Sequence, residues 1–535
     1  MRTYLPLLGL VLAVPSGAIA AMRGFDGLYG QDAYAYFDYG AVSVRQSFLH
    51  LAPLEAFFWP PGYPLLVALA SMPLGQRPFA GQAVSLLMGA LVPVFTAYLV
   101  LALWPTKRTW PILAGLLAGL CGQLWQSSIV VMADTTGLAL ATLSAVALVR
   151  YRQSSQLRWL LIASAAIAYA TLARWIYGLV GIPFAAYALW ALPRARPGSA
   201  LVHVLAGLVL IAAVLGPVLG PPLLGLVSRP SEPAPFAGNL QVYTWSPANA
   251  LRRDFETADG HLAYPLPNGV YYAIAPANLG FFGPMLAPWI AVGLWAAVRE
   301  WPRPTLLLIV GWASVVYAFH AGAPWQNFRF ALAYLPPLAI LVGAGLAWTS
   351  RRLNRRTGVL VAMYGILGLL VTAGGAVRLV HDFIDRKDED LALVRWVQGS
   401  TPAGAHLLSF GPTLAFRQYT SLPTFDLFDL TPAEVDSVLA APGPTYALVD
   451  QHNLEEQWRD KAPALNWDRV RDSAGVSQVG NRGSFSLFRV GSDGLSSAAL
   501  SARQRFRPRI ASAGGPPAVA SLPLSPIRTA TRAPV

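Results

Sequence analysis

The feature that most constrains this chain is a series of apolar runs long enough to cross a lipid bilayer. A membrane-spanning helix needs roughly 20 mainly apolar residues, and such runs recur throughout residues 1–379 of the 535-residue chain. We predict about eleven spanning segments, at approximately 4–21, 79–104, 110–127, 134–149, 158–173, 176–192, 201–227, 280–298, 304–320, 330–349 and 358–379. The apolar run at 63–72 is too short to cross, and we interpret it as a re-entrant or interfacial helix.

Charged side chains are scarce and unevenly distributed. They make up only 12% of the chain, about half the share that soluble domains usually have. This composition argues strongly against a water-soluble enzyme, and the abundant apolar residues exclude a disordered chain. Residues 1–379 contain 23 basic and 10 acidic side chains, whereas residues 380–535 contain 16 of each. We therefore predict an α-helical polytopic membrane domain over 1–379, followed by a more hydrophilic part.

The basic residues indicate which loops face the cytoplasm. Cytoplasmic loops of membrane proteins carry an excess of Lys and Arg, and here the basic pairs and clusters fall in alternate loops, at 107–108, 150–158, 194–196, 299–303 and 351–356. This pattern predicts a cytoplasmic N-terminus in the plasma (inner) membrane and places nine of the ten acids of residues 1–379 outside. It also accounts for the net charge of +13 without nucleic-acid binding. Arg2 and Ala18-Ile19-Ala20 also resemble a cleavable signal peptide, and cleavage there would leave the same topology. The apolar run of about eighteen residues fits an uncleaved first helix better.

The C-terminal part has the pattern of a small extracytoplasmic α/β module over 380–495. We predict strands at Ala405–Phe410, Thr445–Val449 and Phe485–Val490. A helix is predicted to begin at Thr431-Pro432-Ala433-Glu434, because a hydroxyl residue three positions before Glu forms a capping box. Residues 496–535 are rich in Ser, Ala, Pro and Arg, and we predict a disordered basic tail there.

The first long outer loop contains residues suited to catalysis at the membrane surface. If 32–49 is helical, Asp32 and Tyr36 share a face, and Trp59 and Tyr63 follow in the motif Trp-Pro-Pro-Gly-Tyr-Pro-Leu-Leu. A carboxylate among aromatic rings can remove a proton from a hydroxyl nucleophile. Alternatively, Asp32 caps a surface helix and the aromatic residues form an interfacial belt.

These loop motifs resemble the GT-C superfamily of membrane glycosyltransferases. The resemblance covers about residues 1–380 and is strongest to the bacterial branch of protein O-mannosyltransferases, aminoarabinose transferases and lipopolysaccharide-core galacturonosyltransferases. Besides Asp32 and the Pro-Pro-Gly-Tyr-Pro motif, three stretches carry it: Met132-Ala133-Asp134, Thr171-Leu172-Ala173-Arg174, and Phe328-Arg329-Phe330 leading to Tyr334-Leu335-Pro336-Pro337.

The resemblance implies an inverting transfer of a sugar from a polyprenyl-phosphate donor to a hydroxyl of an envelope glycan, lipid or protein, outside the membrane. It implies that Asp32 is the catalytic base and that Arg329 holds the donor phosphate, to which a guanidinium can donate two hydrogen bonds. Asp134 is a second catalytic candidate, with an N-cap of the following helix as its alternative. Arg174 contacts substrate or extends to the membrane interface.

The aromatic residues Tyr36, Trp59 and Tyr63 are assigned to substrate binding. Two separated carboxylates can act with or without Mg²⁺ or Mn²⁺, so the need for a divalent cation stays open. Two other functions stay open as well: a transporter or flippase for a lipid-linked sugar, for which Pro217 and Pro221-Pro222 are candidate helix breaks, and a non-catalytic envelope assembly protein.

Overall fold

The computed structural model describes residues 2–107, 109–192, 197–223, 236, 238, 244–473 and 475–491. The chain forms two compact units. The first comprises Met1–Arg253 and Tyr264–Ile384, and the second comprises Asp254–Ala263 and Asp385–Val535. The predicted tail 496–535 lies outside the described residues.

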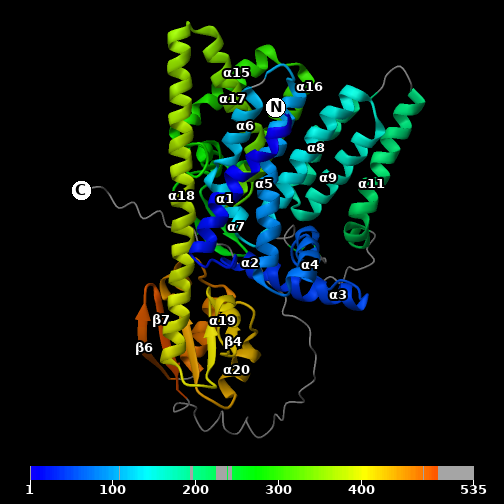
Figure 1. The fold of residues 1–535 in the computed structure, drawn as a ribbon. Helices are drawn as coiled ribbons and strands as arrows, with labels where there is room; N and C mark the ends of the chain where they lie inside the picture. Colours follow the sequence, from blue (N-terminus) through cyan, green and yellow to red (C-terminus); the bar gives the residue numbers. More distant parts are fainter. Residues whose placement is uncertain are drawn as a thin grey trace. The chain divides into compact units, whose positions relative to one another are not determined.

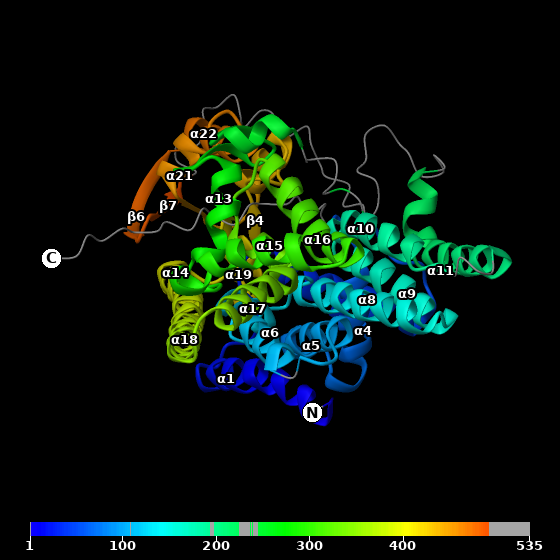
Figure 2. The same cartoon turned by 90° about the horizontal axis from the view of Figure 1, so that it is seen from above.

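The first unit is helical (Figures 1 and 2). Its α-helices are α1 (Leu8–Met22), α2 (Gln31–Phe37), α3 (Arg45–His50), α4 (Gly62–Leu74), α5 (Pro78–Leu103), α6 (Thr109–Gly119), α7 (Gly122–Ile129), α8 (Asp134–Ser154), α9 (Leu157–Ala173), α10 (Ile176–Trp190), α11 (Pro197–Leu223), α13 (Asn268–Ile274), α14 (Gly283–Leu286), α15 (Pro288–Glu300), α16 (Arg303–Gly322), α17 (Leu335–Arg352) and the first part of α18 (Arg355–Ser400). Short 3₁₀ helices are η1 (Arg2–Leu7), η3 (Pro247–Leu251), η4 (Ala275–Ala277) and η5 (Phe328–Tyr334), and η2 (Asp38–Val44) is a π-helix.

The spanning segments predicted from the sequence all coincide with helices, as far as the described residues extend. Within that part of the chain, six helices are long and apolar enough to cross a membrane: Thr3–Met22, Pro78–Leu103, Gly198–Gly220, Arg303–Gly322, Phe328–Arg352 and Arg355–Ser400. The pair α6 and α7, bent by 58°, adds a seventh if it is counted as one span. The chain is therefore an α-helical polytopic membrane protein, as predicted.

Helix α5 lies at the centre of the N-terminal helices, in contact with α1, α6, α7 and α8. Helices α8, α9 and α11 follow one another outward from α5 (Figure 2). The later helices pack through α15 against α17 and through α16 against α10. Small residues permit these close approaches. At Gly293 of α15, for example, the carbonyl group of Leu341 in α17 leaves no room for a Cβ atom.

The second unit is the predicted α/β module. Its five strands are β3 (His406–Ser409), β4 (Thr424–Asp426), β5 (Thr445–Val449), β6 (Val476–Arg482) and β7 (Phe485–Val490), in the order β4-β3-β5-β7-β6. The strands β4, β3 and β5 are parallel, and β7 is antiparallel to both of its neighbours. Its helices are α19 (Thr413–Tyr419), α20 (Pro432–Ala440), α21 (Gln451–Glu456) and α22 (Ala462–Ser473).

Local sequence signals in this module are reproduced in the structure. The Thr431 side chain accepts a hydrogen bond from the Glu434 amide, and the Glu434 carboxylate accepts one from the Thr431 amide, so both halves of the predicted capping box form. The three predicted strands correspond to β3, β5 and β7. Strands β4 and β6 were not predicted, because β4 has only three residues and β6 has no buried face.

Two further features of the fold were not predicted. Helix α18 does not end near residue 379 but continues to Ser400, since neither Gly nor Pro interrupts residues 376–398. The loop before α13 forms a hairpin of β1 (Asp254–Thr257) and β2 (Gly260–Ala263), which belongs to the second unit. The His261 amide donates to the Gln457 carbonyl oxygen at 2.7 Å, and the Gln457 side chain donates to the Asp259 carbonyl oxygen at 2.9 Å.

Candidate active site

Asp32 lies in the first turn of α2, at the start of a helical stretch that continues through η2 and α3 to His50. The residue before the helix is Gly30, whose φ of 71° suits glycine. The N-cap position of this helix is Gly30 and not Asp32. The Oδ2 atom of Asp32 accepts a hydrogen bond of 2.8 Å from Nη2 of Arg329. The capping alternative for Asp32 is therefore wrong, because its side chain faces an arginine.

Arg329 joins the first loop to the late helices. It lies in η5, whose start is fixed by a 2.9 Å hydrogen bond from the Arg329 amide to the side chain of Asn327. Its side chain is only 8% exposed. Besides Asp32, the guanidinium donates from Nη1 to the sulfur of Met132 at 2.8 Å, and its Nε lies 3.7 Å from Oδ2 of Asp134. One arginine thus contacts both predicted catalytic acids.

Asp134 begins α8 but does not cap it. The N-cap position is Ala133, and no side-chain cap hydrogen bond forms there. The carboxylate pairs instead with Nη1 of Arg174 through Oδ1 and faces Arg329 through Oδ2. The N-cap alternative for Asp134 is therefore wrong. The Asp134 carboxylate is only 6% exposed, and the two guanidinium groups beside it offset the cost of burying its negative charge.

Arg174 directly follows the last residue of α9, where its extended backbone (φ −151°) ends the helix. Its side chain is 21% exposed, more than that of Arg329. The Tyr169 hydroxyl donates to the Gly62 carbonyl oxygen at 2.9 Å, and a Cβ at Gly62 would lie 2.6 Å from the carbonyl carbon of Leu172. The Pro-Pro-Gly-Tyr-Pro motif therefore packs against the end of α9, which explains why only glycine fits at residue 62.

The ring of Phe330 lies beside both arginines. The guanidinium carbons of Arg174 and Arg329 are 5.5 and 5.4 Å from its centroid, within the range of cation–π attraction. The ring of His320 stacks on Phe330 at 5.3 Å, with an angle of 14° between the planes. The histidine is 5% exposed, so it lies within the protein. The sequence motif contained Phe330, but nothing in it indicated this role.

The three aromatic residues assigned to substrate binding lie together. The Tyr36 ring centroid is 5.5 Å from that of Trp59 and 5.4 Å from that of Tyr63. Tyr63 is fully buried, and its hydroxyl hydrogen-bonds to Ser85 at 2.8 Å and donates to the Gly81 carbonyl oxygen at 2.9 Å. These contacts favour a packing role for Tyr63, whose ring lies against that of Tyr36. Trp59 is half-buried and is the most accessible of the three.

Burial further disfavours ionisation of the Tyr36 phenol, which is neutral at physiological pH even at its ordinary pKa. Desolvation raises the pKa of its phenol far above the ordinary value, and the nearby Arg174 only partly offsets this effect. The hydroxyl therefore stays neutral at physiological pH and is available as a hydrogen-bond donor. Asp38 is exposed on the same helical stretch and is not part of the cluster formed by Asp32, Asp134, Arg174 and Arg329, which we call the Asp–Arg cluster.

The donor set of the Asp–Arg cluster suits an anion. Among the described residues, no group of three or more His, Cys, Asp or Glu side chains could hold a metal ion. The carboxylates of Asp32 and Asp134 each contact a guanidinium group, so a divalent cation would have to displace an arginine from one of them. Two guanidinium groups side by side are the usual ligands of phosphate oxygens.

Comparisons with known proteins agree with this architecture. No family model matches the chain, and no curated protein matches its sequence. A solved structure of ArnT from Cupriavidus metallidurans bound to undecaprenyl phosphate superposes with a TM-score of 0.57 and 16% identity, covering 90% of this chain and 98% of that one. The apo structure of the same protein gives a TM-score of 0.56 and 15% identity, with coverages of 89% and 97%. The similarity extends over nearly the full length of both chains, and at this identity it shows the fold. The chain therefore shares the fold of these two ArnT structures.

Proposed function

We propose that this protein transfers a sugar from a polyprenyl-phosphate donor to a hydroxyl acceptor at the outer face of the membrane, with inversion at the anomeric carbon. The observation that carries the proposal is the Asp–Arg cluster, in which two acids and two arginines from four distant parts of the sequence meet. One acid and two cations are the groups that this reaction needs. The ArnT structure with bound undecaprenyl phosphate supports a donor of this class.

Asp32 is the proposed base. Its side chain is 16% exposed, compared with 6% for Asp134, so it is the more accessible carboxylate. In the proposed step, Asp32 takes the proton of the acceptor hydroxyl while that oxygen forms a bond to the anomeric carbon. The bond from this carbon to the phosphate oxygen breaks at the same time, and its electron pair leaves with the polyprenyl phosphate. A phosphate is a good leaving group, so no separate acid is required.

Arg329 and Arg174 are the proposed phosphate ligands. The Nη1 group of Arg329 donates to the sulfur of Met132, and a thioether is a weak acceptor. A phosphate oxygen that replaced this sulfur would receive a charge-assisted hydrogen bond, which is roughly twice as strong as a neutral one. Asp134 holds both guanidinium groups and the ring of Phe330 lies beside them, so the cations are oriented before the donor arrives.

Trp59 is the proposed contact for the sugar or the acceptor, because its ring is partly accessible next to Tyr36. The faces of sugar rings carry C–H groups that pack against aromatic side chains. The Tyr36 ring packs against Trp59, and Tyr63 packs in turn against Tyr36.

Mass spectrometry of cell-envelope glycans and lipids would test the proposed function. We expect a deletion strain to lose one sugar substituent and to accumulate the corresponding polyprenyl-phosphate sugar. Wild-type protein should restore both, whereas Asp32→Asn should restore neither. If the lipid-linked sugar instead accumulated only on the cytoplasmic side of the membrane, a flippase would be indicated and the proposal would be wrong.

A further inference from the structure

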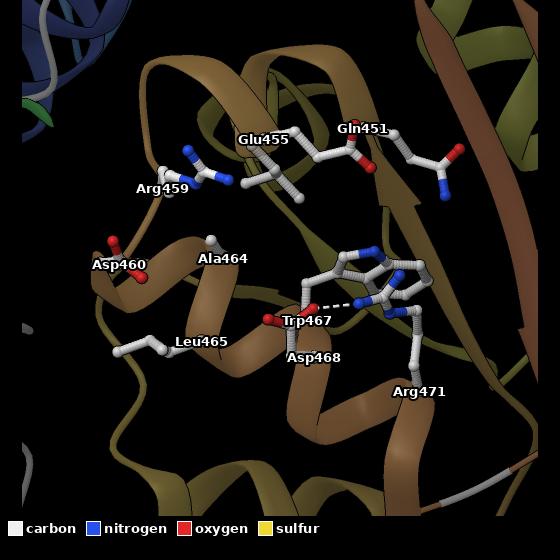
Figure 3. A pocket seen from close by; sticks show the side chains of 10 residues that line it. Gln451, Glu455, Arg459, Asp460, Ala464, Leu465, Trp467, Asp468 and Arg471 are labelled. Carbon is white, nitrogen blue, oxygen red and sulfur yellow. Dashed lines mark hydrogen bonds and ion pairs between the residues drawn. The ribbon is translucent and has the colours of Figure 1, made fainter. Parts of the chain in front are cut away.

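A second candidate site lies in the α/β unit, between α21 and α22 (Figure 3). A surface pocket of about 340 Å³ opens there. It is lined by Gln451, Leu454, Glu455, Arg459, Asp460, Ala464, Leu465, Trp467, Asp468 and Arg471. This volume is near the lower end of the usual range for small-molecule sites, roughly 300–1,000 Å³, so the pocket fits a ligand of one or two rings.

The floor of the pocket is apolar and rigid. Leu454 and Trp467 are 2% and 3% exposed and belong to the core of the unit. The Trp467 ring is held by Phe488, whose centroid is 5.1 Å away. On the other side, the guanidinium carbon of Arg471 lies 6.0 Å from the Trp467 ring centroid, and Arg471 is itself held by an ion pair with Asp468 (Figure 3). Trp467 and Arg471 are therefore held in place by other residues of the unit before a ligand binds.

The opposite wall carries polar groups that are available for a ligand. Glu455 projects from α21, and Arg459 follows in the loop to α22. In the part of the chain that the structure describes, no hydrogen bond or ion pair engages either side chain. The neighbouring Asp460 has a φ of 61°, a left-handed conformation that is uncommon for residues other than glycine. Backbone conformations of this kind are often found at binding sites.

We propose that this pocket binds a short neutral or amino-substituted saccharide. Carboxylates accept hydrogen bonds from sugar hydroxyls, guanidinium groups donate to them, and an apolar floor accommodates the C–H face of the ring. Three carboxylates and two guanidinium groups line the pocket, so its formal charge of −1 disfavours uronate or phosphorylated sugars and favours neutral or cationic ones.

Binding without turnover tests the pocket separately from the reaction. The full-length protein in lipid nanodiscs would be titrated with maltose, chitobiose, glucosamine and digalacturonate, with saturation-transfer NMR as the readout and no donor present. We expect saturable binding of at least one of the first three sugars, and binding of digalacturonate that is at least tenfold weaker. Absence of saturable binding for all of the first three, or tightest binding of digalacturonate, would overturn the proposal.

Matched substitutions locate the binding. Glu455→Gln and Arg459→Ala should each weaken saccharide binding at least about fivefold, because each removes a charged hydrogen-bonding group. Ala464→Leu should weaken it as well by filling the pocket. Glu456→Gln, next along α21, and Arg469→Ala, paired with Asp436 on the outside of α22, should bind as the wild type does. Equal affinity in the pocket variants and the controls would place binding elsewhere and overturn the proposal.

Failure here and failure of the proposed function give different results. If Asp32→Asn retained sugar transfer while the pocket variants lost saccharide binding, the pocket would stand and the catalytic assignment would be wrong. If the pocket variants bound saccharides normally and Asp32→Asn lost transfer, the catalytic assignment would stand and the pocket proposal would be wrong.

Discussion

Nη2 of Arg329 donates a 2.8 Å hydrogen bond to Oδ2 of Asp32, although 297 residues separate the two in the sequence. This ion pair links the first long loop to the start of a late helix. Because Arg329 also lies 3.7 Å from Asp134, the two carboxylates are connected through one guanidinium group. A change at any of these residues should therefore affect the others.

Replacing Asp32 with Asn should abolish sugar transfer without unfolding the protein. The amide keeps the size of the side chain but cannot accept the proton of the acceptor hydroxyl. Loss of a positioned general base typically lowers the rate by about 10²–10⁴-fold. The measurement is transfer from purified polyprenyl-phosphate sugar by reconstituted protein. Asp38→Asn, an exposed acid on the same helical stretch, is the control and should transfer normally. Undiminished transfer by Asp32→Asn would exclude it as the base.

Arg329→Lys should keep the charge but weaken the binding of undecaprenyl phosphate, by about tenfold. Lysine lacks the planar fork that can donate two parallel hydrogen bonds to phosphate. Arg329→Ala should additionally lower the melting temperature, because removing one partner of a buried pair costs roughly 3–5 kcal/mol. Native mass spectrometry with undecaprenyl phosphate gives the affinities. Arg352→Lys, whose side chain is 59% exposed, is the control, and equal affinities for both lysine variants would contradict the assignment.

Asp134→Asn should make the protein depend on phosphate for its stability. Without the carboxylate, Arg174 and Arg329 lose their shared counter-ion and repel each other. We expect a lower melting temperature than in the wild type, and a larger upward shift when undecaprenyl phosphate is added, since the anion replaces the missing charge. Differential scanning fluorimetry in nanodiscs measures both. A shift no larger than that of the wild type would show that the lipid phosphate does not bind between these arginines.

Thr431→Ala should destabilise the α/β unit by about 1 kcal/mol, the usual value of a lost N-cap. The substitution removes the hydroxyl that accepts from the Glu434 amide. Hydrogen exchange should become faster at the first turn of α20. Ser437→Ala, an exposed position on the same helix, should leave exchange unchanged, and faster exchange in both variants would indicate a general effect of the substitutions and not the cap.

Within the α/β unit, the region around β4 should be more stable in mild acid than at neutral pH. Burial raises the pKa of Asp426, and desolvation followed by repulsion from Asp426 raises the pKa of Asp429 to about 6. A carboxyl whose pKa is raised by folding stabilises the folded state below its unfolded value, near 3.9, and this contribution is lost as the pH rises through the folded pKa. We therefore expect exchange protection near β4 to fall between about pH 4 and 6. Asp429→Asn should reduce the pH dependence of exchange protection. A rise in protection between about pH 4 and 6 in the wild type would contradict the prediction.

Features encoded by neighbouring residues could be read from the sequence. The capping box at Thr431 and Glu434, the strand at Thr445–Val449 and the apolar helices all depend on spacing within one element. The positions of Asp32 and Arg329 as site residues came from the resemblance to a family, and the structure brings them together.

Features that depend on distant contacts could not be read in this way. Asp134 has the sequence context of an N-cap, and only the folded chain places Arg174 and Arg329 where they compete for its carboxylate. Tyr63 and Trp59 are both aromatic residues of the same loop motif, so the sequence does not distinguish their roles. In the structure, the Tyr63 hydroxyl is engaged in hydrogen bonds with Ser85 and Gly81. The β1–β2 hairpin is held to Gln457 by one hydrogen bond from the His261 amide to the Gln457 carbonyl oxygen and one from the Gln457 side chain to the Asp259 carbonyl oxygen, and no motif around these residues predicts the contact.

The Asp–Arg cluster contains two negative and two positive side chains and is electrically neutral when all four are charged. A donor phosphate with one negative charge therefore leaves the occupied cluster with a charge of −1. In the proposed step, the proton that moves from the acceptor hydroxyl to Asp32 changes the charge of the cluster from zero to +1, and the departing polyprenyl phosphate gains one negative charge, so the total stays at −1. The cluster thus becomes positive at the moment when the leaving phosphate becomes more negative, which ties activation of the acceptor to departure of the donor phosphate.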